Sequence, residues 1–133
     1  MIPAYTILLI RMDDIMRTVL IVDDSALMRT LMRTIVTKNG YEVVGEADNG
    51  SLGVEKYKEL LPDIVTMDVT MKGMDGIEAL RQIMNVNVGA NVLMVSSMGQ
   101  GTIVRQAIEY GAKDFILKPY EEKQVLNALH SLS

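Results

Sequence analysis

Five short apolar runs alternate with five stretches of helical periodicity, and this alternation constrains the fold more than any other feature of the sequence. The runs cover residues 18–22, 42–47, 64–68, 91–95 and 114–117. After each run, apolar residues recur every three or four positions, as they do on one face of a helix. Strands that alternate with helices in this way form a parallel sheet with helices on both faces. The chain of 133 residues has room for one such domain.

Right-handed crossovers leave few ways to arrange five parallel strands. The sequence predicts the flavodoxin-like strand order 2-1-3-4-5, which is a doubly wound α/β fold. In that order the carboxyl ends of the first, third, fourth and fifth strands lie along one rim. Open parallel sheets bind their ligands outside these ends, so the residues that follow the four strands are the candidate functional residues.

The stretch after the first run shows the helical pattern most clearly. Apolar residues recur there every four positions, and Asn39-Gly40 marks the end of the helix. The side predicted to face the sheet contains Leu27, Leu31 and Ile35, with Met28, Met32 and Val36 beside them. We therefore expect this helix to bury one continuous apolar stripe.

Polar side chains follow the four strands whose ends share the rim. Asp23 and Asp24 follow the first strand, and Asp68 ends the third. Ser96 follows the fourth strand, and Lys118 follows the fifth. Because the carboxyl ends of parallel strands meet at one edge of the sheet, we expect these five side chains to converge.

Each of these residues also has an ordinary structural explanation when it is taken alone. Two aspartates after a strand are commonly part of a solvated loop or the N-cap of a helix. An aspartate at the end of a buried strand can be a Walker B carboxylate, but the chain has no GxxxxGK[ST] loop to bind a nucleotide. A lysine that follows a strand is more commonly a loop cation than a catalytic group. The combination, and not any single residue, indicates a function.

Three carboxylates on one rim need a cation. Two like charges about 4 Å apart repel by roughly 4 kcal/mol at an effective dielectric constant of about 20. The chain has no cysteine and one histidine, so an oxygen-bound metal such as Mg²⁺ is expected. Such a site can accept a phosphoryl group on Asp68. Lys118 would then neutralise phosphoryl oxygens, and the Ser96 hydroxyl would donate a hydrogen bond to one of them.

Charge and hydropathy argue against several other partners. The net charge of −4 is opposite to that of a nucleic-acid-binding surface. The apolar segment Tyr5–Ile10 is too short to span a bilayer and has no signal-peptide cleavage site after it. We therefore expect neither a nucleic-acid partner nor a membrane segment. Residues 1–15 are interpreted as an N-terminal extension that is dispensable for phosphorylation.

Five short motifs surround the candidate residues. They are VLIVDD ending at Asp24, VTMD ending at Asp68, MDG ending at Gly76, VLMVS ending at Ser96 and AKDFILKP ending at Pro119. In this order the set resembles the receiver domain of two-component response regulators, and the resemblance covers residues 16–133. The SSMGQ segment that begins at Ser96, together with the lack of an output domain, resembles the CheY-type single-domain chemotaxis regulators in particular.

The resemblance implies a role for each residue at the rim. Asp68 takes a phosphoryl group from a CheA-like histidine kinase in a Mg²⁺-dependent reaction. Asp24 and Asp68 bind Mg²⁺ directly, and the backbone carbonyl of Thr70 is a third protein ligand. Asp23 acts on the metal mainly through water. The peptide bond between Lys118 and Pro119 is expected to be cis.

The same resemblance implies how the signal leaves the site. Ser96 and the aromatic side chain of Phe115 form a conformational switch. The switch acts on the surface of the fourth helix, fifth strand and fifth helix, where a motor switch protein or an adaptor binds. A CheC/CheX-like phosphatase is a further expected partner. The protein is then a cytoplasmic monomer, and it is no enzyme beyond catalysing its own phosphorylation and dephosphorylation.

Two other functions fit a chain of this kind. One is a phosphorelay intermediate, which passes its phosphoryl group on to a histidine phosphotransferase; reverse transfer from the phosphorylated protein would identify it. The other is a flavin-binding electron carrier of the same fold, which a yellow preparation would support. The chain has no tryptophan to stack on a flavin, and its acidic rim would repel the flavin phosphate.

Overall fold

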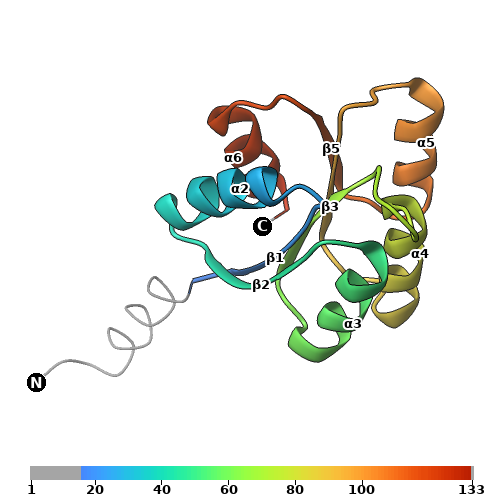
Figure 1. Cartoon of the computed structure of the whole chain (residues 1–133), viewed down its shortest axis with the longest axis horizontal. Coiled ribbons are helices and arrows are strands. Elements are labelled where there is room, and N and C mark those ends of the chain that lie inside the picture. The colour runs from blue at the N-terminus through green and yellow to red at the C-terminus, as the bar shows by residue number, and fades with distance from the viewer. Residues whose placement is uncertain (1–15, 133) are drawn as a thin grey trace, which may run out of the picture.

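A five-stranded parallel sheet forms the centre of the structure, a computed structural model that describes residues 16–132 (Figure 1). The strand order is β2-β1-β3-β4-β5, which confirms the predicted topology. In chain order the elements are β1 (Thr18–Val22), α2 (Ala26–Lys38), β2 (Glu42–Ala47), α3 (Gly50–Leu60), β3 (Ile64–Asp68), α4 (Gly76–Val86), β4 (Val92–Ser96), α5 (Gly101–Glu109), β5 (Asp114–Leu117) and α6 (Glu122–Ser131). The extension predicted at residues 1–15 lies outside the described residues.

Different helices cover the two faces of the sheet (Figure 1). Helices α2 and α6 pack on one face, and α3, α4 and α5 pack on the other. Successive strand residues point to opposite faces, so Ile21 belongs to the core layer covered by α2 and α6, whereas Leu20 and Val22 belong to the layer covered by α3, α4 and α5. Every residue of β3 and β4 is buried, because these two central strands are covered on both sides.

The register of the strands brings their carboxyl ends level. Val22 pairs with Met67, so the residue after β1 lies beside the end of β3. Ser96 pairs with Leu117, so Lys118 is the first residue beyond β5. The fourth strand was predicted at residues 91–95, one residue before the observed β4. Ser96 still belongs to the strand because its carbonyl accepts a hydrogen bond of 2.8 Å from the Lys118 N–H. The remaining four strands have their predicted bounds.

The buried face of α2 differs from the predicted stripe. Met32, Ile35 and Val36 are buried as expected, but Leu27 is 77% exposed and Leu31 is 41% exposed. A step of four residues overshoots one helical turn by about 40°, so a strict four-residue repeat turns away from the sheet. The core-facing side instead combines steps of four and three residues, and it therefore leaves the two leucines in solvent.

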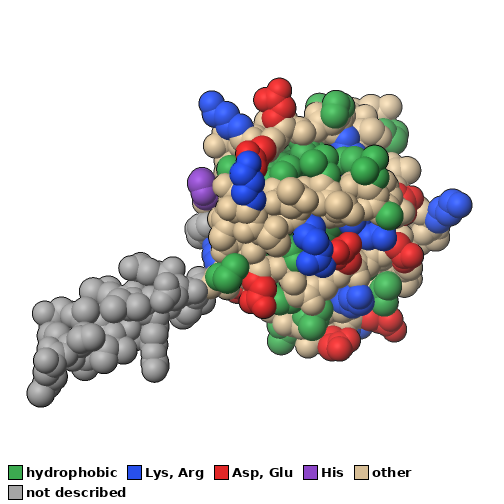
Figure 2. Space-filling view, turned by 60° about the vertical axis from the view of Figure 1, so that its left-hand side comes forward, with side chains coloured by type: hydrophobic (Ala, Val, Ile, Leu, Met, Phe, Trp, Pro, Cys, Tyr) green, Lys and Arg blue, Asp and Glu red, His purple; other side chains and the backbone are tan. Residues whose placement is uncertain are grey.

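The surface carries charges of both signs. On the face shown in Figure 2, the Lys and Arg side chains lie among Asp and Glu side chains and form no continuous basic stripe. Within residues 16–132, no helix is long and apolar enough to cross a membrane.

Candidate functional site

Three aspartates meet at the carboxyl ends of β1 and β3. Asp23 and Asp24 follow β1, and Asp68 is the last residue of β3. One carboxylate oxygen of each lies within 4.8 Å of the other two. Asp23 and Asp68 are 6% and 5% exposed, whereas Asp24 is open to solvent. The structure thus places two buried carboxylates and one accessible carboxylate around one point.

Lys118 reaches the same point from the end of β5. Its Nζ lies 2.7 Å from Asp23 Oδ2 and 3.4 Å from Asp68 Oδ1. Its side chain is 16% exposed, so both ion pairs are largely shielded from water. The Lys118–Pro119 peptide bond is cis, which confirms the prediction.

The two buried aspartates differ in what their oxygens contact. Asp23 is engaged at both oxygens, because Oδ1 accepts a 2.9 Å hydrogen bond from the Ser25 N–H and Oδ2 contacts Lys118. Asp68 contacts Lys118 through Oδ1, and its Oδ2 has no hydrogen bond or ion pair with any residue in the range 16–132. The N-cap of α2 is Ser25, whose side chain accepts from the Met28 N–H, so neither aspartate after β1 caps this helix. Of the two buried aspartates, Asp68 is therefore the one with an oxygen that no described residue contacts.

Burial and charge shift the protonation of the site. Burial, and next the negative charge of Asp23, raise the pKa of Asp68 from 3.8 to about 6, although Lys118 opposes the shift. Burial also raises the pKa of Tyr120 to about 12, and the carboxylates of Asp23 and Asp68 add to the effect. Tyr120 therefore stays neutral beside the cluster. Asp68 carries its charge at neutral pH only against an energetic cost, which a bound cation would relieve.

The donor set of this cluster fits a hard divalent cation. One ammonium group faces three carboxylates, so a cation of charge two would balance the site. Oxygen ligands suit Mg²⁺, and the exposed Asp24 leaves room for the water molecules that Mg²⁺ retains. Thr70 lies two residues after Asp68, and its backbone carbonyl accepts no hydrogen bond from within residues 16–132. This carbonyl is free to act as a further oxygen ligand.

The two predicted switch residues lie on one face of the sheet. Ser96 is fully buried, and its Oγ accepts a 2.9 Å hydrogen bond from the Met98 N–H. Phe115 pairs with Met94 across the strands and packs, half-buried, against the core beneath α3, α4 and α5. Ser96 follows Met94 by two residues, so its side chain points to the same face. Both side chains therefore share the layer that contains α5.

Gly76 supports the loop that follows Asp68. Its N–H donates a 2.7 Å hydrogen bond to the Val69 carbonyl, which ties the start of α4 to the end of β3. A Cβ atom at this position would lie 1.9 Å from the Asp68 carbonyl oxygen and 2.8 Å from its carbonyl carbon. Only glycine allows α4 to approach the backbone of Asp68 this closely.

We expect Gly76→Ala to lower the free energy of unfolding by about 2 kcal/mol, because the added methyl group must displace backbone atoms. Chemical denaturation at neutral pH measures the change. Gly101→Ala is the matched control, since nothing lies within 4 Å of a Cβ at that position in the first turn of α5. The control should be neutral or slightly stabilising. Equal effects of the two substitutions would contradict the packing argument.

Two contributions to the site were not predicted from the sequence. Tyr120 lies beside Asp23 and Asp68, and its position directly after the Lys118-Pro119 motif could have suggested this. Arg29 donates a hydrogen bond of 2.7 Å from Nη1 to the Asp23 carbonyl. The only sequence signal for Arg29 was its place on α2, one turn after the N-cap.

Comparison with known proteins identifies the family. The sequence-family model for the response regulator receiver domain matches residues 19–130, which is most of the chain. The chain belongs to this family. The receiver is 54% identical over 117 residues to the chemotaxis protein CheY of Thermotoga maritima, and the match covers 88% of this chain and 98% of that protein. It is also 54% identical to the CheY of Bacillus subtilis, covering 84% of this chain and 93% of the relative.

Solved structures agree with this assignment. The receiver superposes on CheY in the CheX–CheY–BeF₃–Mg²⁺ complex of Borrelia burgdorferi with a TM-score of 0.86 and 39% identity, covering 87% of this chain and 88% of that chain. The receiver is therefore a CheY-type chemotaxis response regulator, and the predicted family and fold are both confirmed.

Proposed function

We propose that this receiver accepts a phosphoryl group on Asp68 from a CheA-like histidine kinase in a Mg²⁺-dependent reaction. The observation that carries the proposal is the pairing of Lys118 with two of three clustered carboxylates. Asp68 is the acceptor because Asp23 is engaged at both oxygens and Asp68 is not. Among the described residues, every fully buried side-chain oxygen or nitrogen has a hydrogen-bond partner. The second oxygen of Asp68 has no such partner, so it is not fully buried and an incoming group can reach it.

In the proposed transfer, an oxygen of Asp68 attacks the phosphorus of a kinase phosphohistidine. The new O–P bond forms while the P–N bond breaks, and the imidazole leaves. Lys118 is already within ion-pair distance of Asp68, so its ammonium group can follow the phosphoryl oxygens. Mg²⁺ bound by Asp24, Asp68 and the Thr70 carbonyl, with Asp23 acting through water, would supply the second positive charge that phosphoryl transfer requires.

The phosphoryl group then acts on the switch. Phosphorylation adds negative charge at Asp68, and the Ser96 hydroxyl is a neutral donor on the neighbouring strand. When Ser96 turns toward a phosphoryl oxygen it leaves space at the end of β4, and Phe115 moves into it. The surface formed by α5, β5 and α6 changes with Phe115, so a motor switch protein or an adaptor can bind there. Some active form exists without phosphate, because the switch is a two-state equilibrium.

The other proposed partners follow from the relatives. A chemotaxis receiver needs its signal removed, and the Borrelia burgdorferi relative is found in complex with CheX. We therefore include a CheC/CheX-like phosphatase among the partners of this receiver. We place the protein in the cytoplasm, as a monomer, where the kinase and the motor would both be within reach.

A phosphotransfer assay tests this function. A phosphorylated CheA-like kinase should lose its phosphoryl group to the wild-type receiver when Mg²⁺ is present, and not when a chelator is present. The Asp68→Asn variant should accept none. Transfer that ignores Mg²⁺ would contradict the proposal. Return of the group to a histidine phosphotransferase would instead support the phosphorelay alternative.

Ser96→Ala should still accept phosphate but should lose most of its phosphate-dependent gain in partner affinity. The reason is that alanine cannot donate the hydrogen bond that draws the end of β4 toward Asp68. A partner-binding titration with and without beryllofluoride measures the gain. Ser97→Ala is the matched control, because Ser97 is exposed whereas Ser96 is buried. If Ser96→Ala kept the full gain, the proposed switch would be wrong even with phosphorylation intact.

A further inference from the structure

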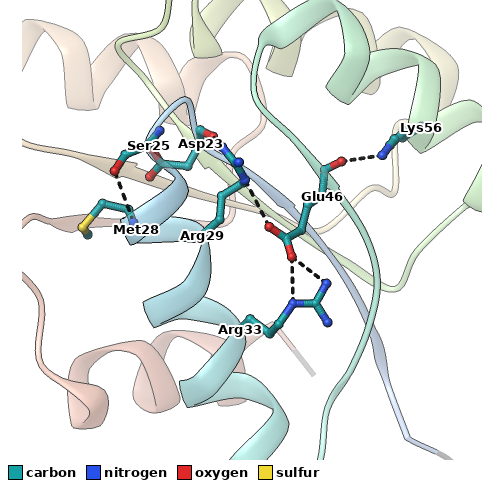
Figure 3. Close-up of polar contacts among 7 residues, drawn as sticks. All are labelled: Asp23, Ser25, Met28, Arg29, Arg33, Glu46 and Lys56. Carbon is teal, nitrogen blue, oxygen red and sulfur yellow. Dashed lines mark hydrogen bonds and ion pairs between the residues drawn. The ribbon is translucent and has the colours of Figure 1, made fainter.

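Arg29 joins α2 to two other parts of the structure next to the acidic rim (Figure 3). Its Nη1 donates a 2.7 Å hydrogen bond to the Asp23 carbonyl. Its Nε donates a 3.1 Å hydrogen bond to Glu46 Oε1 near the end of β2. The Arg29 side chain is 19% exposed, so these contacts are mostly shielded from water. One guanidinium group thus holds the turn after β1 and is itself held by β2.

Glu46 is fixed from three sides, so it is a firm support for Arg29. Arg33, one turn later on α2, contacts the second carboxylate oxygen through Nε at 2.7 Å and Nη2 at 2.6 Å. Lys56 of α3 donates a hydrogen bond to the Glu46 backbone carbonyl (Figure 3). Neither Arg33 nor Lys56 contacts Asp23 or Asp24 within the described residues. Arg29 is the member of this network that reaches the rim.

Asp23 is held at all four of its polar groups. Its N–H donates to the Ala47 carbonyl at 3.0 Å, and its two carboxylate oxygens contact Ser25 and Lys118. The Asp23 carbonyl is held by Arg29. This carbonyl belongs to the peptide that leads into Asp24, so its orientation sets where the next carboxylate lies. Asp24 itself has no hydrogen bond or ion pair with other residues in the described part of the chain.

We propose that Arg29 is a positioning residue for the magnesium site. By holding the Asp23 carbonyl against Glu46, it fixes the turn that presents the exposed Asp24 carboxylate beside Asp68. The inference rests on the proposed function, since it concerns the Mg²⁺ that phosphorylation requires. Residues behind metal ligands orient those ligands and contribute to affinity without touching the metal.

If Arg29 positions the site, its removal weakens Mg²⁺ binding, whereas charge alone predicts that its removal strengthens Mg²⁺ binding. A guanidinium close to the site repels Mg²⁺, so loss of its charge would tighten metal binding if electrostatics dominated. Loss of the hydrogen bonds would weaken binding if positioning dominates. The sign of the change therefore separates the two accounts. Lysine at this position keeps the charge but is a point donor, and it cannot span both partners as the planar guanidinium does.

The test measures Mg²⁺ binding by calorimetry for the wild type, Arg29→Met, Arg29→Lys and the matched control Arg33→Met. Arg29→Met should raise the dissociation constant for Mg²⁺ by about ten-fold, at the lower end of losses seen behind metal ligands. Arg29→Lys should raise it in the same direction. Arg33→Met should raise it far less, because Arg33 helps to hold Glu46 but makes no hydrogen bond or ion pair with Asp23 among the described residues. With a small-molecule phosphodonor, the Arg29→Met variant should need more Mg²⁺ than the wild type to reach half of its maximal phosphorylation rate. At saturating Mg²⁺ its phosphorylation rate should equal that of the wild type.

The outcomes separate this inference from the proposed function. If the wild type binds Mg²⁺ and Arg29→Met binds it equally or more tightly, the positioning role is overturned and the function stands. Equal weakening in Arg33→Met would also overturn it, because a loss shared by both variants reflects the general packing of α2 on β2. If the wild type does not bind Mg²⁺, both proposals fail.

Discussion

Without Mg²⁺, Asp68→Asn should raise the free energy of unfolding at pH 7 by about 3 kcal/mol. The pKa of Asp68 is raised from an ordinary 3.8 to about 6 in the folded protein. The folded state therefore binds a proton at this carboxylate more tightly than the unfolded state does. Each pKa unit corresponds to about 1.4 kcal/mol. The ionised carboxylate therefore destabilises the fold at neutral pH, and asparagine removes that charge with little change in shape.

The sign of the pH dependence follows from the direction of this shift. At pH values well below 3.8 the carboxyl group is protonated in both states, and the difference in stability between wild type and Asp68→Asn should vanish. The difference should grow as the pH rises through the window between 3.8 and about 6, and stay constant above it. Urea denaturation over a pH series in the presence of a chelator measures it. A difference that is independent of pH, or a less stable variant at pH 7, would contradict the account.

Mg²⁺ should raise the free energy of unfolding of the wild type by about 2.7 kcal/mol when its concentration is about 100 times its dissociation constant. The cation relieves the repulsion among the three carboxylates, which are brought together only in the folded protein. Thermal or chemical unfolding with and without Mg²⁺ measures the gain. It should be largely lost in Asp24→Ala.

The control for this prediction is a variant that lacks a carboxylate far from the three aspartates. Glu109 is exposed near the end of α5 and contacts no other described residue through an ion pair. Glu109→Ala changes the net charge by the same amount as Asp24→Ala, and it should keep the full response to Mg²⁺. An equal response in all three proteins would mean that Mg²⁺ acts on the general charge of the surface and not at the rim.

The strands and the rim could be predicted from the sequence because parallel sheets are buried on both faces. Buried strands appear as continuous apolar runs, and the residue after each run lies at one edge of the sheet. That rule alone brought Asp23, Asp68 and Lys118 together, and the structure shows the three in contact.

The errors arose where the rotation of a helix decides the contact. Leu27 and Leu31 were expected in the core but are exposed, because a four-residue repeat drifts around the helix. The same rotation turns Arg29 toward Glu46, which lies 17 positions further along the chain. The close approach of Gly76 to the Asp68 carbonyl likewise depends on how α4 meets β3. Such contacts depend on how elements pack, which local periodicity does not specify.

The measurement that tests the central proposal most directly is the intact mass of the protein after incubation with a small-molecule phosphodonor. The wild type should gain the mass of one phosphoryl group when Mg²⁺ is present and none when it is chelated. Peptide mapping after borohydride reduction should place the modification on Asp68, and Asp68→Asn should remain unmodified. A phosphoryl group that maps to another residue, or that is gained equally by Asp68→Asn, would contradict the assignment of Asp68 as the acceptor.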